Sequence, residues 1–197
     1  KEADRIENTE DASPLTVGTY YPYNSPLYDL TTIEILNDIE GEGTVAYSLD
    51  STSSLPEGMS LKDGKLYGTL KKANKEEQVI KFVVRGKNQT SAFFTLTLGE
   101  VVQQVPTWSV PTGLTAVVGE TLQDVYVPYS SKGTYSWPDA TVSVGTVATT
   151  LTEQELIFRP TDIVNYDWET AATNAGATYE NGVIICKVSI VVSAGKP

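Results

Sequence analysis

The sequence predicts an all-β protein whose strands pack face to face as β-sandwiches. Two observations carry this prediction. Short stretches rich in β-branched and aromatic residues alternate with stretches rich in turn residues, about seven of them in the first half of the chain. In addition, apolar residues nowhere recur with the helical period over the length that a surface helix needs, so we expect little helix.

The clearest predicted element is a β-hairpin that turns at Asp63-Gly64. A type I′ turn needs positive φ at both central residues, and Asp-Gly tolerates that conformation. The resulting register sets Lys62 opposite Lys65, Leu61 opposite Leu66 and Met59 opposite Gly68. One face of this ribbon is apolar, and Gly68 leaves room for Met59. Because such a hairpin is not stable alone in water, we expect it to lie on a second sheet.

The other strands are predicted in chain order from the same residue preferences. In the first half we expect strands at residues 15–20, 30–36, 44–49, 79–85 and 92–98. In the second half we expect strands at residues 113–118, 125–127, 134–137, 142–147, 155–159 and 183–192. Residues 169–181 are rich in Ala, Thr, Asn and Gly, and we expect them to form an inserted loop.

The length of 197 residues suits two domains. Residues 1–13 are polar and highly charged, which predicts a flexible leader. We assign the first β-sandwich to residues 14–100 and the second to residues 106–197. A short linker at residues 99–106 ends at a proline and leaves little slack between the domains.

The balance of charge disfavours two classes of partner. Acidic residues outnumber basic ones by 25 to 14, and the formal net charge is −11. Such a chain is not attracted to a phosphate backbone or to anionic lipids. No stretch approaches the roughly 20 apolar residues of a membrane span. We therefore expect no nucleic-acid partner and no insertion of this segment into a membrane.

The side chains of the commonest catalytic sites are scarce. The chain has no histidine, which removes Ser-His and Cys-His pairs and most zinc sites. Its one cysteine, Cys186, shares a predicted strand face with Ile184 and Val188, so we expect a buried, inert thiol. The many carboxylates leave a glycosidase-type acid pair open by count alone. We expect a protein that is not an enzyme, with no catalytic residue, cofactor or metal site.

The first half resembles an immunoglobulin-like domain that is common in bacterial surface proteins and distantly similar to cadherin repeats. The motifs that carry the resemblance are an aromatic strand at residues 45–49, Leu-Pro-Glu-Gly-Met-Ser-Leu at residues 55–61 and Gly-Lys-Leu-Tyr-Gly-Thr at residues 64–69. Met59 stands where that family usually has leucine. The resemblance implies structural roles: Pro56 and Gly58 shape a corner, and Leu55, Met59 and Leu61 supply core.

The second half is similar to a different immunoglobulin-like repeat, found in tandem in long Gram-positive surface proteins. Four motifs occur in order: Gly-Glu-Thr-Leu-Gln-Asp-Val at residues 119–125, Gly-Thr-Tyr-Ser-Trp at 133–137, Ser-Val-Gly at 143–145 and Phe-Arg-Pro-Thr-Asp-Ile-Val-Asn-Tyr at 158–166. The departure is residues 169–181, where that family passes almost directly into the final strand. This segment is either an insertion without a role of its own or a recognition element.

Two acidic clusters are candidates for cation binding or for capping. The first consists of Asp38, Glu40 and Glu42. We interpret these three carboxylates as solvated surface charge, and a weak calcium site is the alternative. The second consists of Asp162, Asn165 and Asp167. Because Asp162 and Asn165 belong to the repeat motif, we favour a turn-capping role for this cluster.

Some Gram-positive surface sandwiches carry Lys–Asn isopeptide bonds, which need a buried lysine beside a carboxylic acid. Lys81 and Lys187 lie in apolar strands. Because successive side chains of a strand point to opposite faces, Lys81 points away from the face of Phe82, and Lys187 points away from the face of Cys186. We therefore do not expect the bond.

Aromatic side chains near the start of the first domain are candidate ligand-binding residues. They are Tyr20, Tyr21, Tyr23 and Tyr28. A ring face accepts the apolar side of a sugar, so these tyrosines would form a stacking platform, although strand and loop packing explains them equally well. Trp108, at the boundary, is expected to pack between the domains, and Trp137 is expected in the core.

The function that these observations and resemblances imply is non-catalytic. We expect a structural or adhesion module of a bacterial cell-surface or secreted protein, two immunoglobulin-like β-sandwiches in tandem that space or present other domains. The alternative is a carbohydrate-binding accessory module of a secreted enzyme. We expect an extracellular, cell-surface or cell-wall location, a monomer, and a host or cell-wall protein or glycan as partner.

Overall fold

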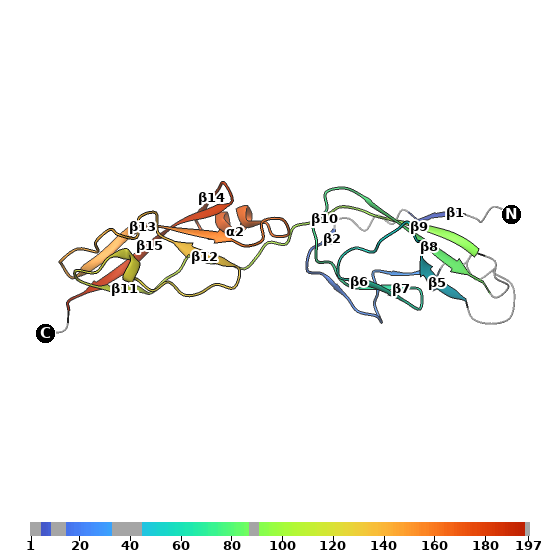
Figure 1. The fold of residues 1–197 in the computed structure, drawn as a ribbon, viewed down its shortest axis with the longest axis horizontal. Helices are drawn as coiled ribbons and strands as arrows, with labels where there is room; N and C mark the ends of the chain where they lie inside the picture. Colours follow the sequence, from blue (N-terminus) through green and yellow to red (C-terminus); the bar gives the residue numbers. More distant parts are fainter. Residues whose placement is uncertain (1–4, 9–14, 33–44, 87–90, 196–197) are drawn as a thin grey trace. The chain divides into compact units, whose positions relative to one another are not determined.

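The computed structural model describes residues 5–8, 15–32, 45–86 and 91–195 (Figure 1). The chain divides into two compact units, Lys1–Gln104 and Val105–Pro197, which we call the N-terminal and C-terminal units. Strands dominate the described residues of both units and helix is scarce, so the predicted all-β character is confirmed. Within the described ranges no helix has the length and apolar composition needed to cross a membrane.

The N-terminal unit contains ten strands among its described residues. They are β1 (Arg5–Asn8), β2 (Leu15–Thr16), β3 (Tyr20–Tyr21), β4 (Tyr28–Asp29), β5 (Ala46–Leu49), β6 (Met59–Lys62), β7 (Lys65–Thr69), β8 (Gln78–Arg85), β9 (Ser91–Leu98) and β10 (Val101–Val102). One sheet has the order β1-β9-β8-β5, and a second joins β3, β4 and β6 to β7. A small third sheet pairs β2 with β10.

Apolar side chains from both larger sheets form one core in this unit. Phe82 of β8 and Phe94 of β9 are fully buried, and Leu66 of β7 and Met59 of β6 belong to the same cluster. The Phe82 and Phe94 rings lie 6.2 Å apart. The two sheets therefore pack against each other through their apolar faces, as the alternation of β8 and β9 requires.

The hairpin of β6 and β7 has the predicted register. Lys62 pairs with Lys65, Leu61 with Leu66 and Met59 with Gly68. Asp63 and Gly64 have φ values of 52° and 78°, the positive pair that a type I′ turn requires. The space at Gly68 is occupied by main chain, because a Cβ there would lie 2.3 Å from the carbonyl oxygen of Gly58.

Two expectations for the start of the chain are corrected. Residues 5–8 of the predicted flexible leader form β1, which pairs in parallel with β9. The strand expected at residues 15–20 is divided into β2 and β3, because Gly18 adopts a φ of +90° and turns the chain between them.

A third expectation, the strand at residues 30–36, is also corrected in part. Leu30–Thr32 form a 3₁₀ turn, η1, and residues 33–44 lie outside the described residues. The acidic cluster of Asp38, Glu40 and Glu42 falls within that range.

The C-terminal unit is built on one five-stranded sheet. Its elements are β11 (Leu114–Val117), the 3₁₀ turn η2 (Leu122–Asp124), β12 (Gly133–Ser136), β13 (Thr149–Pro160), α2 (Trp168–Asn174), β14 (Thr178–Glu180) and β15 (Val183–Ser193). The strand order is β11-β15-β13-β12, and β14 also pairs with β15 (Figure 1). The apolar side chains of Leu122, Val125 and Val144 join the sheet's core from segments outside the strands.

The strands expected at residues 125–127 and 142–147 are wrong. Before the first segment, a capping box between Thr121 and Asp124 caps the N-terminus of η2, and this 3₁₀ turn ends at Asp124. In the second, Val142 accepts a hydrogen bond from Leu122 N–H and Val144 N–H donates to the Glu120 carbonyl, so these groups bond to a turn rather than to a strand ladder. Both segments supply buried valines without forming strands, because β propensity reflects packing as much as backbone preference.

The loop expected at residues 169–181 is also wrong. It contains most of α2 and all of β14. The Asp167 carboxylate caps the helix by accepting hydrogen bonds from the Thr170 N–H at 3.0 Å and the Thr170 hydroxyl at 2.6 Å. Trp168, Ala171 and Ala172 share the i, i+3, i+4 face and are buried.

Candidate ligand-binding groove

The four candidate tyrosines lie in different environments. Tyr20 is 65% exposed, whereas Tyr21 and Tyr28 pack against the core of the N-terminal unit. Tyr20 and Tyr21 are consecutive in β3, so their side chains point to opposite faces. Tyr28 stacks on Phe94 with ring centroids 5.6 Å apart. The structure therefore does not gather these rings on one face.

Tyr23 is held by neighbours from the hairpin. Its hydroxyl donates a hydrogen bond to the Asp63 carboxylate at 2.8 Å, and this bond raises the pKa of the Tyr23 hydroxyl. The Lys65 ammonium lies 4.4 Å from the ring centroid, and the Tyr67 ring meets it edge-on at 5.5 Å. The ring of Tyr23 is thus already in contact with a cation and a second ring.

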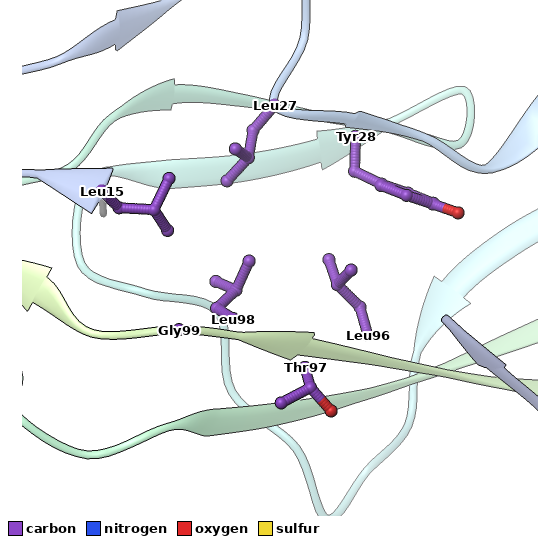
Figure 2. Close-up of a pocket in the computed structure, with 7 residues that line it drawn as sticks. All are labelled: Leu15, Leu27, Tyr28, Leu96, Thr97, Leu98 and Gly99. Carbon is purple, nitrogen blue, oxygen red and sulfur yellow. The ribbon is translucent and has the colours of Figure 1, made fainter. Parts of the chain in front are cut away.

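A small void lies beside Tyr28 in the N-terminal unit (Figure 2). Its volume is about 10 Å³, and Leu15, Leu27, Leu96 and Leu98 supply most of its lining. Figure 2 shows these leucine side chains extending into the space between the strands. An apolar void that barely accommodates one water stays dry, so this void is a packing defect and not a binding site.

The C-terminal unit contains an open groove of about 520 Å³, a volume typical of ligand sites. We call it the β12 groove, because β12 supplies much of its lining. It is lined by Gln123, Val125, Val127, Pro128, Tyr129, Ser130, Gly133, Thr134, Tyr135, Ser136, Trp137, Ala140 and Leu156. Segment 123–130 and the segment around β12 therefore both contribute to one concave surface.

The groove runs along an edge of the sheet. Among the strands that the structure describes, β13 is the neighbour of β12, in a register that sets Gly133 opposite Pro160 and Tyr135 opposite Phe158. Pro160 has no N–H, and Thr161 N–H donates to the Lys132 carbonyl at 3.0 Å. By the alternation of antiparallel pairs, the backbone N–H and C=O of Tyr135 then point away from β13, toward the unpaired edge.

Tyr135 is a fixed part of the groove wall. Its ring lies 4.8 Å from that of Phe158, and its hydroxyl accepts a 3.1 Å hydrogen bond from the indole N–H of Trp108. Burial raises the pKa of the Tyr135 hydroxyl, and the bond from Trp108 opposes this rise. Trp108 also packs 5.6 Å from Phe158. Trp108 thus packs against the core of the C-terminal unit, and its expected role between the domains stays a prediction.

Tyr129 is the exposed counterpart to Tyr135 in the groove. Its side chain is 86% exposed, and the neighbouring Tyr126, which does not line the groove, is 76% exposed. Trp137 lines the groove while packing partly against the core, as expected for it. Sequence reasoning missed this site. The available signal was Tyr129, which follows Val127-Pro128 directly after the strand expected at residues 125–127.

The acidic cluster of Asp162 and Asp167 has the expected capping role. The Asp162 carboxylate accepts hydrogen bonds from the N–H groups of Val164 and Asn165 and from the Asn165 amide, at 2.9–3.0 Å. Partial burial raises the pKa of Asp162, but these hydrogen bonds outweigh it and the pKa is lowered overall. Across the described residues, no three His, Cys, Asp or Glu side chains gather to hold a metal ion.

Cys186 is buried in β15 as predicted. Its side chain is 1% exposed, and its Sγ lies 3.4 Å from the Leu156 carbonyl oxygen. Desolvation raises the pKa of the thiol to about 11. Lys187 is exposed and the Lys81 ammonium lies 4.3 Å from the ring centroid of Phe93, so neither lysine is buried beside a carboxyl group.

Comparisons with known proteins assign no family to the chain. No family model and no curated protein matches it. Among solved structures, it is similar to an endo-fucoidan hydrolase from glycoside hydrolase family 107, with 12% sequence identity and a TM-score of 0.31. The alignment covers 77% of this chain and 24% of that one, so the chain spans about a quarter of the length of the hydrolase. A similarity of this size carries no argument about fold or activity.

Proposed function

We propose that the chain is a non-catalytic structural and adhesion module of a bacterial cell-surface or secreted protein. In this proposal each unit is an immunoglobulin-like β-sandwich, and the two in tandem space or present other domains outside the cell. The partner would be a host or cell-wall protein or glycan. The motifs at residues 55–61 and 119–125 support the proposal, and a strand pairing shared by the two units carries it furthest.

In each unit a strand from the beginning pairs in parallel with a strand from the end. In the C-terminal unit, β11 pairs with β15, from Leu114 opposite Ile190 to Val117 opposite Ser193. In the N-terminal unit, β2 pairs with β10 and β1 pairs with β9, both in parallel. The two strands of a parallel pair run in the same direction. The chain therefore enters the first strand at one end of the pair and leaves the last strand at the opposite end.

This pairing suits a module that carries tension. When a unit is pulled through its two chain ends, a parallel terminal pair is loaded along the strands, so its hydrogen bonds share the load. An antiparallel terminal pair would be opened one bond at a time. Forced unfolding is governed by the unfolding rate, which such a pair slows. A spacer between a cell and its surroundings needs this resistance, whereas a catalytic domain does not.

The character of the core also supports a non-catalytic role. Throughout the described ranges, buried side chains are apolar, with the Cys186 thiol as the one ionisable group among them. The raised pKa of that thiol opposes formation of a nucleophilic thiolate. The carboxylates of Asp162 and Asp167 are engaged in capping bonds.

Single-molecule force spectroscopy of the full chain tests the proposal. Val118 N–H donates to the Ser193 carbonyl at 2.9 Å, so Val118→Pro removes a bond of the β11–β15 pair. Val117 N–H instead donates to the Glu120 carboxylate at 3.0 Å, so Val117→Pro is the matched control. We expect Val118→Pro to lower the unfolding force of the C-terminal unit more than Val117→Pro does. Equal forces for the two variants would count against a load-bearing role.

A further inference from the structure

The β12 groove has an uncharged lining on a strongly acidic chain. None of its 13 lining residues is charged, although the chain carries 25 acidic and 14 basic residues. A groove without a cation offers nothing to attract a polyanion, and the net charge of −11 repels one. A groove without a carboxylate offers a cationic ligand no ion pair. The charge distribution therefore favours a neutral ligand.

The aromatic side chains of the groove provide apolar faces. Tyr135 is fixed by Phe158 and Trp108, and Trp137 is partly buried against the core. Tyr129 leaves 86% of its surface in water. Aromatic rings present an apolar face together with a polar group, which matches a ligand that has both C–H faces and hydroxyl groups.

The polar side chains of the groove are neutral hydrogen-bonding groups. Gln123 supplies an amide and Ser130 supplies a hydroxyl. Thr134 and Ser136 alternate with Tyr135 along β12, so their side chains lie on the other face of the strand. The Ser130 oxygen accepts a bond from Lys132 N–H at 3.2 Å, which leaves its hydroxyl proton able to donate. The outward N–H and C=O of Tyr135 add one donor and one acceptor. Such groups match the donors and acceptors of sugar hydroxyls.

An added β-strand fits this edge less well than a sugar chain does. Gly133 is already bridged to Ser130 along the unpaired edge. Pro138, directly after Trp137, has no N–H to offer. Tyr135 and Trp137 are then the residues that remain for a peptide to pair with, which is too few for a strand ladder.

We propose that the β12 groove binds a neutral polysaccharide, with sugar rings stacked on Tyr129 and Trp137 and sugar hydroxyls bonded to Gln123, Ser130 and the outward main-chain groups of Tyr135. The site goes beyond the structural role proposed above and does not depend on it. It also differs from the four tyrosines of the N-terminal unit, because it lies wholly within the C-terminal unit.

Affinity electrophoresis of the full chain in gels containing soluble polysaccharides tests this proposal, with calorimetry for the dissociation constant. The neutral panel is mixed-linkage β-glucan, xylan, galactomannan and dextran, and polygalacturonate is the anionic comparison. We expect retardation by at least one neutral polysaccharide. Tyr129→Ala should weaken binding at least tenfold, whereas Tyr129→Phe, which keeps the ring face, should lose less than threefold. Tyr126→Ala is the matched control, an exposed neighbour outside the groove, and should bind like the unaltered chain.

Three results would overturn the proposal. The first is an absence of retardation by every neutral polysaccharide of the panel. The second is binding of a neutral polysaccharide that Tyr129→Ala does not weaken. If Tyr20→Ala then abolishes this binding, the site lies in the N-terminal unit instead. The third is retardation by polygalacturonate alone. If extended peptides bind the groove while no polysaccharide does, strand addition at Tyr135 replaces the proposal. None of these results bears on the unfolding forces that test the structural role.

Discussion

Gly68→Ala tests how tightly the central hairpin is built into the N-terminal unit. Gly68 has a φ of +124°, and a Cβ there would lie 2.3 Å from the Gly58 carbonyl oxygen and 3.1 Å from the Met59 Cα. Both neighbours are main-chain atoms, so no side chain can rotate away. The Gly58 oxygen also accepts a 3.1 Å hydrogen bond from Thr69 N–H, which would have to lengthen if Gly58 moved.

The expected loss of stability follows from these contacts. Positive φ costs an alanine about 2 kcal/mol, and a weakened hydrogen bond costs about 1 kcal/mol more. A loss of about 3 kcal/mol in a unit of this size lowers its Tm by roughly 12–24 °C. Calorimetry of the full chain measures this shift. The three tryptophans, Trp108, Trp137 and Trp168, all lie in the C-terminal unit, so the Tm followed by tryptophan fluorescence should stay unchanged.

Gly113→Ala is the control for positive φ without a clash. Gly113 has a φ of +72° in the C-terminal unit, and a Cβ there would meet no atom within 4 Å. A φ of +72° lies at the edge of the left-handed region that alanine can enter, whereas the +124° of Gly68 lies well outside it. We therefore expect a loss of only about 1 kcal/mol, followed by tryptophan fluorescence. If Gly68→Ala cost no more than Gly113→Ala, the reasoning from the close approach of Gly58 would be refuted.

Three further predictions concern the C-terminal unit. Cys186 should not react with thiol reagents in the folded chain at pH 8 and should react fully in denaturant, and reaction of the folded chain would contradict its burial and its pKa of about 11. Because the pKa of Asp162 is lowered on folding, its stabilisation is present above the ordinary value of 3.8 and is lost as the pH falls through the folded value. The Tm followed by tryptophan fluorescence should therefore fall below about pH 4, and it should fall by less in Asp162→Asn. Identical acid profiles for the two proteins would refute the stabilising role of the Asp162 carboxylate. Removing the helix cap in Asp167→Ala should cost about 1 kcal/mol in urea unfolding, whereas Glu169→Ala, which removes no capping bond, should cost clearly less.

The parts of the fold that local chemistry decides could be predicted from the sequence. The hairpin register follows from Asp63-Gly64 alone, because the turn type fixes which residues face each other. The burial of Cys186 follows from alternation along an apolar strand. In both cases the deciding residues are neighbours in the sequence.

Other parts depend on partners that are distant in the sequence. Residues 142–147 have the composition of a strand, but Val142 and Val144 bond to the turn at residues 120–122. The helix α2 has 7 residues, too few for a helical period to be distinguished from chance. Trp108 could be assigned to the core only once Tyr135 and Phe158 were known to surround it.

The candidate site was not predictable for the same reason. The groove exists because segment 123–130 lies beside β12, and no local pattern in either segment reports that approach. The tyrosines that the sequence did suggest are close together along the chain. Strand alternation, the core and Lys65 place their rings in separate surroundings.

The proposed mechanical role is tested most directly by pulling the C-terminal unit in two directions. Cysteines at the exposed positions Thr112 and Ala194 attach the handles so that β11 and β15 are sheared. Cysteines at Val117 and Ala194 attach them at the same end of the pair, so that the strands are peeled apart. The buried Cys186 takes no handle. We predict a several-fold higher rupture force for the first geometry, and equal forces in the two directions would contradict the account.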